Sequence, residues 1–247
     1  MRIATYKIVL LGEGAVGKTS LRNRFMGEEF TRAYQTTIGA DFAVKELRLG
    51  QKTIRFQIWD LAGQPRFELL RSIYCQGAFG ALVLFDITVL STFEKVNDWI
   101  EELWQHNGSG IIPVILIGNK IDLRSAFPDA ITSEEGLAMA EHFSESSKEA
   151  GIIIPYLETS AKTGEQVDRA FHMLGEGISN FLDNKPALAN RIAVQPAFVK
   201  ESIKGIDVLA EKSKAKRKSR IPKKKPPAKK KKPPAKKKKI SRLRKKR

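Results

Sequence analysis

Short apolar runs alternate with amphipathic stretches from the start of the chain to about residue 183. Runs such as Ala78–Phe85 and Ile111–Ile117 have the length of buried strands and are too short to span a bilayer. The stretches between the runs space their apolar residues as amphipathic helices do. The expected strands cover residues 5–11, 40–49, 53–60, 80–86, 112–118 and 152–157, and the expected helices cover residues 18–27, 66–76, 91–106, 133–149 and 164–183.

This order of elements predicts an α/β fold on one six-stranded, mostly parallel sheet. Strands 40–49 and 53–60 are separated by a short turn that contains Gly50, which favours a hairpin and hence one antiparallel edge strand. The other strands alternate with helices, so they should run parallel and be covered by helices on both faces. A ligand of such a sheet binds beyond the carboxyl ends of its strands. Thr132, three residues before Glu135, is a start signal for helix 133–149.

Positive charge is concentrated at the end of the sequence. Residues 211–247 hold 22 Lys and Arg and one acidic residue, a formal charge of +21. Residues 1–210 hold 22 Lys and Arg and 26 acidic residues, a formal charge of −4, which brings the whole chain to +17. The segment 211–247 twice repeats Pro-Pro-Ala-Lys-Lys-Lys-Lys. Proline forbids a helix and like charges repel, so we expect this basic tail to be disordered.

The sequence therefore predicts a globular domain of residues 1–185, a linker of residues 186–210 and the basic tail of residues 211–247. The linker has apolar residues at helical spacing, and it also contains Gly205, so a short helix and a disordered linker both remain open. The single cysteine, Cys75, excludes an internal disulfide bond. The first residues lack the cleavage site of a secretory signal, and we expect a cytoplasmic protein.

A glycine-rich segment, Gly12–Thr19, follows the first apolar run and precedes a helix-like stretch. Its sequence, GEGAVGKT, matches the phosphate-binding pattern G-x-x-x-x-G-K-[ST] in the required strand, loop and helix context. Glycines allow backbone N–H groups to surround a phosphate, Lys18 adds a positive charge, and Thr19 offers a hydroxyl to Mg²⁺. The residues expected to contact the phosphates are Gly12, Glu13, Gly14, Ala15, Val16, Gly17, Lys18, Thr19 and Ser20.

Two further segments predict the magnesium site and the catalytic step. Asp60 ends the strand 53–60, where a carboxylate is placed to hold Mg²⁺, and Thr37 lies in a loop from which its hydroxyl could reach the metal and sense the γ-phosphate. The expected metal-binding residues are thus Thr19, Thr37 and Asp60. Gly63 offers an N–H to the γ-phosphate, and Gln64 can orient the attacking water.

The base is expected to lie between two other loops. Asn119, Lys120 and Asp122 follow a buried strand, and the Asp122 carboxylate can accept hydrogen bonds from the N–H donors of guanine, which adenine lacks. A second loop, with Ser160, Ala161 and Lys162, would meet the base from the other side. The five segments occur in the one order that completes a guanine-nucleotide site.

On these motifs, residues 5–183 resemble a small GTPase of the Ras superfamily, most closely the Rab branch. Rab-like segments include Ile38–Phe42 and Trp59–Phe67. The resemblance implies a P-loop GTPase domain in which Phe30 packs on guanine, Tyr34 closes over the phosphates and Gly14 leaves room for Gln64. It also implies effector-facing residues, which are Ile38, Phe42, Trp59 and Tyr74. For the three aromatic residues, ordinary core or half-buried packing is the alternative.

The sequence departs from the Rab pattern at three places. Leu61 stands where the family has threonine, and Pro65 stands where it has glutamate. Proline restricts the residue before it to extended backbone angles, so the Gln64 side chain should be oriented differently from its counterpart in the family. The C-terminal cysteines that carry prenyl groups in Rab proteins do not occur in this sequence, and we expect no prenyl anchor.

Two functions from different classes remain open at this point. One is a monomeric GTP-binding switch that hydrolyses GTP slowly unless stimulated, meets effector, exchange and activating proteins through its two switch regions, and acts in membrane traffic or signalling. Its basic tail would then bind an anionic membrane surface. The other is a module that binds nucleic acid or an acidic partner through the tail and carries a vestigial GTPase domain. A tail that is only a solvated spacer is a third possibility.

Overall fold

A computed structural model describes residues 3–30, 37, 40–63 and 68–184 of the 247-residue chain, with the backbone alone at residues 68–71. All of these residues belong to the first of two units into which the chain divides, 1–192 and 193–247. The expected linker and basic tail lie outside the described residues, as do Tyr34, Ile38 and Gln64.

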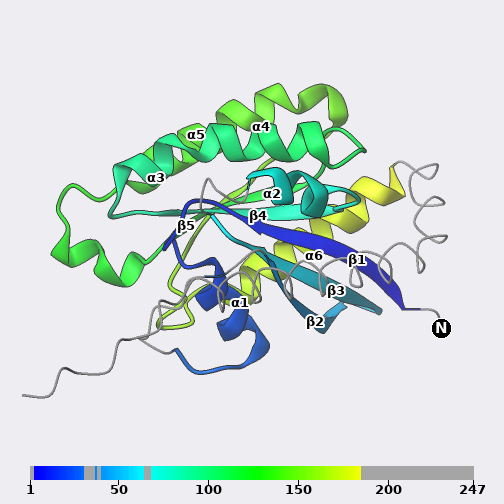
Figure 1. The fold of residues 1–247 in the computed structure, drawn as a ribbon, viewed down its shortest axis with the longest axis horizontal. Helices are drawn as coiled ribbons and strands as arrows, with labels where there is room; N and C mark the ends of the chain where they lie inside the picture. Colours follow the sequence, from blue (N-terminus) through cyan, green and yellow to red (C-terminus); the bar gives the residue numbers. More distant parts are fainter. Residues whose placement is uncertain (1–2, 31–36, 38–39, 64–67, 185–247) are drawn as a thin grey trace, which may run out of the picture. The chain divides into compact units, whose positions relative to one another are not determined.

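One six-stranded sheet forms the centre of the fold, with helices on both of its faces (Figure 1). The strands are β1 (Ala4–Leu11), β2 (Ala40–Leu49), β3 (Lys52–Leu61), β4 (Gly80–Asp86), β5 (Val114–Asn119) and β6 (Tyr156–Thr159), in the spatial order β2-β3-β1-β4-β5-β6. The β2–β3 pair is antiparallel and turns at Gly50, whose φ is +56°, and the other pairs are parallel. The predicted mixed sheet with an antiparallel edge strand is therefore confirmed.

The helices form two layers. Helices α1 (Lys18–Met26) and α6 (Val167–Asp183) cover one face of the sheet, and α2 (Glu68–Cys75), α3 (Leu90–Glu94), α4 (Val96–His106) and α5 (Ser133–Ser146) cover the other (Figure 1). Every residue of β4 and β5 is buried, as expected of parallel strands between two helical layers. Phe25 of α1 and Phe171 of α6 stack with their ring centroids 3.8 Å apart, which joins the two helices of one layer.

Proline and loop hydrogen bonds shorten two of the expected strands. β5 begins at Val114 rather than at 112, directly after Pro113, which has no N–H to donate. The predicted strand 152–157 is wrong at its start, because the N–H of Ile154 donates to Ser144 Oγ at 2.9 Å instead of to a neighbouring strand. Pairing with β5 begins at Tyr156, after Pro155.

Two expected helices are interrupted. The helix predicted over 91–106 is divided into α3 and α4 at Lys95, whose ψ of −5° is turn-like. The helix predicted over 133–149 ends at Ser146, and a 3₁₀ turn, η3 (Lys148–Ala150), follows. Ser147 donates its hydroxyl to Ile152 O at 2.8 Å and so fastens the loop that replaces the last helical turn.

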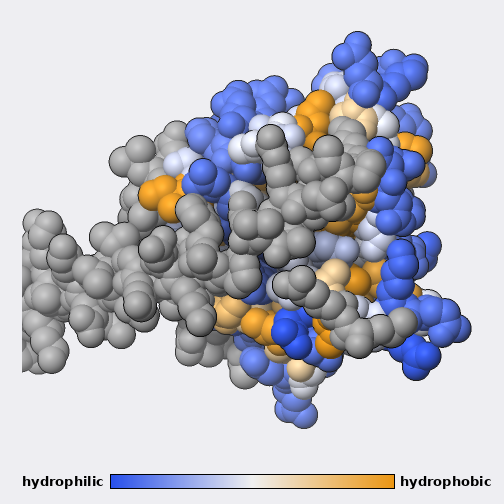
Figure 2. Space-filling model, turned by 90° about the vertical axis from the view of Figure 1, so that its right-hand side faces the viewer, coloured by the Kyte–Doolittle hydropathy of each residue, from blue (hydrophilic) through white to orange (hydrophobic). Residues whose placement is uncertain are grey.

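The apolar residues on one side of the described surface are scattered. Figure 2 shows the side on which β1 begins, where the described surface is mainly hydrophilic with separate, smaller apolar areas. Apolar residues scattered in this way need no partner. Among the described residues, no helix has both the length and the apolar character needed to cross a membrane.

Candidate nucleotide site

The loop between β1 and α1 requires glycine at two positions. Gly12 has a φ of +130°, and a Cβ there would lie 2.1 Å from Leu84 O. Gly17 has a φ of +102°, and a Cβ there would lie 2.3 Å from Asn119 Nδ2. Both distances are below any real contact, so the loop takes this path only with glycine. Gly14 differs, because a Cβ there would meet no atom within 4 Å.

Lys18 is positioned inside the curve of this loop. Its side chain is buried, and its ammonium donates to Gly12 O and Glu13 O, each at 2.7 Å. Ser20 lies in the first turn of α1, which has no side-chain cap at Gly17, so the first N–H groups of the helix remain available to an anion. A buried ammonium beside a helix N-terminus is the arrangement that binds phosphate.

Thr19, Thr37 and Asp60 meet beside the loop. Thr19 Oγ1 donates to Asp60 Oδ2 at 2.5 Å and lies 2.9 Å from Thr37 Oγ1. Asp60 is fully buried, and its Oδ1 has no hydrogen-bond partner among the described residues. Burial raises the pKa of Asp60, against the opposing effects of the Thr19 hydroxyl and the Lys18 and Arg22 charges.

These three side chains fit a divalent cation. A buried carboxylate oxygen without a partner is costly, and a cation removes that cost. Two hydroxyls and a carboxylate supply the oxygen ligands that Mg²⁺ prefers. Gly63 follows on the same side: a Cβ there would lie 2.4 Å from Gly12 O, so the chain after β3 runs against the phosphate loop. Leu61, which departs from the Rab pattern, is a buried side chain at the end of β3.

Asn119 joins the phosphate loop to the two loops expected at the base. Its Nδ2 donates to Val16 O at 2.8 Å, and its Oδ1 accepts hydrogen bonds from Thr159 Oγ1 at 3.1 Å and from Ala161 N at 3.2 Å. Asn119 is 1% exposed, so its side chain braces the site from within the protein.

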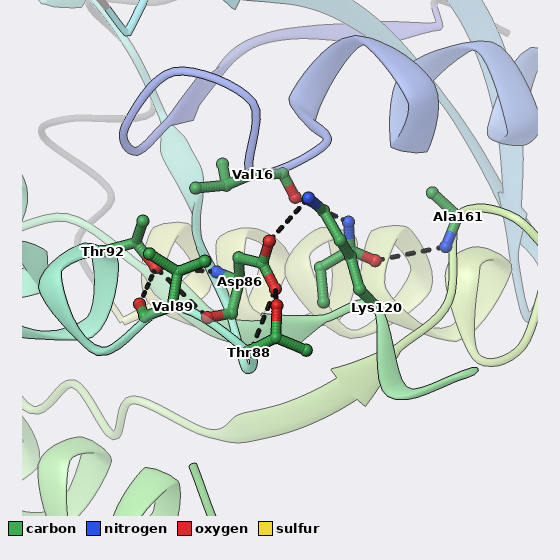
Figure 3. Close-up of polar contacts among 8 residues, drawn as sticks. Val16, Asp86, Thr88, Val89, Thr92, Lys120 and Ala161 are labelled. Atoms are coloured by element: carbon green, nitrogen blue, oxygen red, sulfur yellow. Dashed lines mark hydrogen bonds and ion pairs between the residues drawn. The ribbon is translucent and has the colours of Figure 1, made fainter. Parts of the chain in front are cut away.

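Lys120 and Asp122 follow Asn119 in the chain and have separate polar partners. Asp122 lies in the first turn of the 3₁₀ helix η2 (Ile121–Ala126), which the sequence did not predict. It accepts hydrogen bonds from Ser160 Oγ at 2.6 Å and Lys162 Nζ at 3.2 Å. Burial would raise the pKa of Asp122, but these hydrogen bonds outweigh it and lower the pKa, which keeps the carboxylate ionised. Lys120 has a left-handed backbone, with a φ of +72°, and its ammonium lies 2.6 Å from Asp86 Oδ2 (Figure 3).

Most of the expected site residues within the described part of the chain therefore lie at one end of the sheet. Ala15 takes a positive φ of +66° in the phosphate loop, and Phe30, after α1, is 39% exposed. Two residues that support this site were not expected from the sequence. Asp86 pairs with Lys120, and Arg24 of α1 donates to Lys162 O at 2.7 Å. The sequence places Asp86 at the carboxyl end of a buried strand, without indicating its partner.

Phe42 and Tyr74, both expected to face effectors, each have a ring close to that of Trp59. The ring centroids of Phe42 and Trp59 are 5.1 Å apart, and those of Trp59 and Tyr74 are 5.6 Å apart. Phe42 is 37% exposed, whereas Trp59 is 3% and Tyr74 is 8% exposed. Of the three, Phe42 is thus the one that is exposed at the surface, and the other two are buried behind it.

Comparison with known proteins agrees with this geometry. The sequence profile of the Ras family matches residues 7–180. Ras-related protein RABA5b from Arabidopsis thaliana is 41% identical over 180 residues, which cover 73% of this chain and 77% of that protein. Ras-related protein RIC2 from Oryza sativa subsp. japonica is 41% identical over 166 residues (67% and 71%), and Ras-related protein Rab11A from Nicotiana tabacum is 36% identical over 193 residues (78% and 84%). The chain belongs to the Ras family and is a Rab-like small GTPase.

Proposed function

We propose that this protein is a switch that binds GTP with Mg²⁺ at the site described above and hydrolyses it to GDP and phosphate. The observation that carries this proposal is the Asn119 side chain, which contacts the phosphate loop, Thr159 and Ala161 at once. A nucleotide must meet its phosphate-binding and base-binding residues together, and Asn119 holds the two groups at a fixed separation. Such preorganisation lowers the entropic cost of binding.

The phosphate half of the site binds and positions the reacting group. The N–H groups of Gly12–Gly17 and the Lys18 ammonium would hold the β- and γ-phosphates. Thr19, Thr37 and Asp60 would hold Mg²⁺, which when bound neutralises charge on the phosphate oxygens. Gly63 would approach the γ-phosphate because it already lies against the loop.

The base half selects guanine. The ionised Asp122 accepts hydrogen bonds from guanine N–H donors, and Ser160 and Lys162 hold its two oxygens in place. An adenine base offers this carboxylate no N–H donors of its own and is rejected for that reason.

A change in the base that the protein prefers tests the role of Asp122. The Asp122→Asn protein should lose affinity for GTP and gain affinity for xanthosine triphosphate, because an amide donates where the carboxylate accepted. The measurement is competition of GTP, xanthosine triphosphate and ATP against a fluorescent GDP on the purified full-length chain. Equal affinity of the unmutated protein for ATP and GTP would overturn the proposal.

Catalysis would depend on Gln64, whose placement lies outside the described residues. We propose that it orients the attacking water, that Pro65 restricts its backbone, and that hydrolysis is slow until a partner supplies an arginine, which raises such rates by about 10³–10⁵-fold. Gln64→Leu should then trap the GTP-bound form. Single-turnover hydrolysis that Gln64→Leu leaves unchanged, with and without an activating protein, would remove Gln64 from this role.

In the cell, we infer a switch in membrane traffic that meets effector, exchange and activating proteins through the two segments around Phe42 and Tyr74. The exposed Phe42 ring on the sheet edge, supported by Trp59, favours this surface. We further propose that the basic tail binds an anionic membrane surface. Membership of the Ras family favours this switch over a nucleic-acid-binding module with a vestigial domain.

A further inference from the structure

Asp86 ends β4 and belongs to none of the five sequence motifs. Its two carboxylate oxygens have separate partners: Oδ1 accepts hydrogen bonds from Thr88 N at 3.0 Å and Thr88 Oγ1 at 2.8 Å, and Oδ2 lies 2.6 Å from Lys120 Nζ. The Asp86 side chain is 8% exposed and that of Lys120 is 30% exposed. A buried carboxylate that is fully used in this way is fixed in orientation, and it fixes the ammonium it meets.

The backbone around this ion pair is held as well. Asp86 and Asn119 are register partners at the ends of β4 and β5, and Ile87 N donates to Asn119 O at 3.1 Å. Lys120 then takes a left-handed conformation, and its side chain reaches back to Asp86 above the end of the strand (Figure 3). The Asp86 carboxylate and the Asn119 side chain are therefore placed by the neighbouring, paired ends of β4 and β5.

We propose that Asp86 is a positioning residue for guanine nucleotide, which acts by holding Lys120. The assignment rests on the proposed function of the site, because Lys120 is one of the residues expected at the base. A lysine side chain has several rotatable bonds and loses much freedom when it is ordered on a ligand. An ammonium already held by Asp86 has lost that freedom before the nucleotide arrives, so the bound state is longer-lived.

The alternative is that Asp86 only shapes the turn after β4. Thr88 and Thr92 support that alternative, because Thr92 Oγ1 accepts from Asp86 N at 3.0 Å and donates to Val89 O at 2.8 Å (Figure 3). The two roles use different oxygens of the carboxylate, so substitutions can separate them. A role in the turn is independent of Lys120, whereas a positioning role disappears when Lys120 is absent.

The test is a double-mutant cycle on the dissociation rate of a fluorescent GDP from the full-length chain with Mg²⁺. Asp86→Asn should raise the rate roughly tenfold, within the range found for contacting pairs. Lys120→Met should raise it at least as much. In the Lys120→Met background, Asp86→Asn should add less than about twofold.

Two matched controls complete the cycle. Thr88→Ala removes the hydroxyl on the far oxygen of the same carboxylate and should change the rate less than about twofold. Asp98→Asn neutralises a carboxylate in an exposed pair with Lys95, 2.7 Å apart, and should have no effect. If Asp86→Asn does not fold, Asp86→Glu keeps the charge but moves it by one methylene, and it enters the same cycle with Lys120→Met.

Three results would overturn the assignment. They are a normal rate for Asp86→Asn, an equal increase with and without Lys120, and a Thr88→Ala effect as large as that of Asp86→Asn. In each of these the unmutated protein binds GDP and the proposed function stands. An unmutated protein that binds no guanine nucleotide would overturn the proposed function and this assignment together.

Discussion

The glycines of the phosphate loop meet different requirements, although their side chains are identical. Gly17 has both a positive φ and a backbone within reach of Asn119 Nδ2, whereas Gly14 has open space around its Cβ position. The pattern G-x-x-x-x-G-K-[ST] marks the first and last glycines and leaves Gly14 undetermined. The geometry therefore shows which of these positions require glycine, which the motif alone does not.

Gly17→Ala should lower stability and weaken GDP binding, because it strains the backbone and pushes away the amide that bonds to Val16. Left-handed strain at a non-glycine residue costs roughly 1–3 kcal/mol. Thermal unfolding and GDP dissociation of the Mg²⁺–GDP protein measure both effects. Gly14→Ala is the matched control and should leave both near those of the parent, and an equal loss in the two variants would contradict this reading.

Lys7 illustrates a residue that no motif marks. It lies on β1, donates to Gln76 O at 2.7 Å and places its ammonium 5.0 Å from the centroid of the Trp59 ring. Burial lowers the pKa of Lys7 to about 8 from its ordinary value of 10.5. The residues that surround it come from β3 and the end of α2, so its environment arises only when distant segments pack together.

This pKa predicts a rise in stability with pH. Between about pH 8 and 10.5 the unfolded chain keeps the Lys7 proton and the folded chain releases it, so the unfolding free energy increases through this window. The pKa values of Tyr6, Tyr74 and Tyr156 are raised in the folded protein, so these residues lower the unfolding free energy as the pH rises near 10 and above. The effect of Lys7 is therefore best measured below about pH 9.5.

Unfolding temperatures of the parent and of Lys7→Met, with saturating GDP, measure this effect. The difference between parent and Lys7→Met should shift in favour of the parent from about pH 7.5 to 9.5. Lys52→Met is the control, because its ammonium is exposed in a loose pair with Asp183 at 3.7 Å. A difference that does not change with pH would show that Lys7 keeps an ordinary pKa.

The boundaries of helices and strands were predicted best where residues close in the sequence determine them. The start of α5 follows from Thr132 and Glu135, which form a capping box: Thr132 Oγ1 accepts from Glu135 N at 3.2 Å, and Glu135 Oε2 accepts from Thr132 N at 2.7 Å. The end of α5 was missed, because Ser147 and the loop to Ile152 determine it. Those contacts join the helix to a segment whose path depends on β6.

Thr132→Ala should destabilise the protein by about 1 kcal/mol, since it removes the acceptor for an N–H in the first turn. Denaturant unfolding of the GDP-bound protein measures this loss. The loss should shrink in a Glu135→Ala background, because the two bonds support each other. Ser146→Ala removes a hydroxyl that donates only along the helix, to His142 O, and should cost much less. Equal losses for Thr132→Ala and Ser146→Ala would count against the capping box.

At the scale of the whole domain, alternation of strands and helices predicts the sheet, and the five motifs predict which end of it holds the site. The same alternation cannot give the contacts that hold the site rigid. Asp86 with Lys120 and Arg24 with Lys162 O join segments that are 34 and 138 residues apart in the sequence. Such pairs leave no periodic signal, and they become visible only when the strand ends are placed side by side.

Charge separates the chain into two regions, with −4 on residues 1–210 and +21 on residues 211–247. Near an anionic leaflet each Lys or Arg contributes on the order of 1 kcal/mol, so several acting together suffice for reversible binding. Exposed charges are screened over about 8–10 Å near physiological salt, and binding should weaken steeply as salt is added. Nucleic acid attracts the tail by the same physics, so salt dependence alone does not identify the partner.

Sedimentation with liposomes, with duplex DNA or RNA as competitor, separates these partners. The full-length chain should bind vesicles that contain phosphatidylserine, should not bind pure phosphatidylcholine vesicles, and should stay on the anionic vesicles when nucleic acid is added. Removing residues 211–247 should abolish vesicle binding and leave GDP binding intact. Glutamine at every lysine of 229–232 and 236–239 keeps the length and the prolines, and should weaken vesicle binding because charge carries the attraction. Vesicle binding that is unchanged after truncation, or transfer of the intact chain to nucleic acid, would contradict the proposal that the tail binds a membrane.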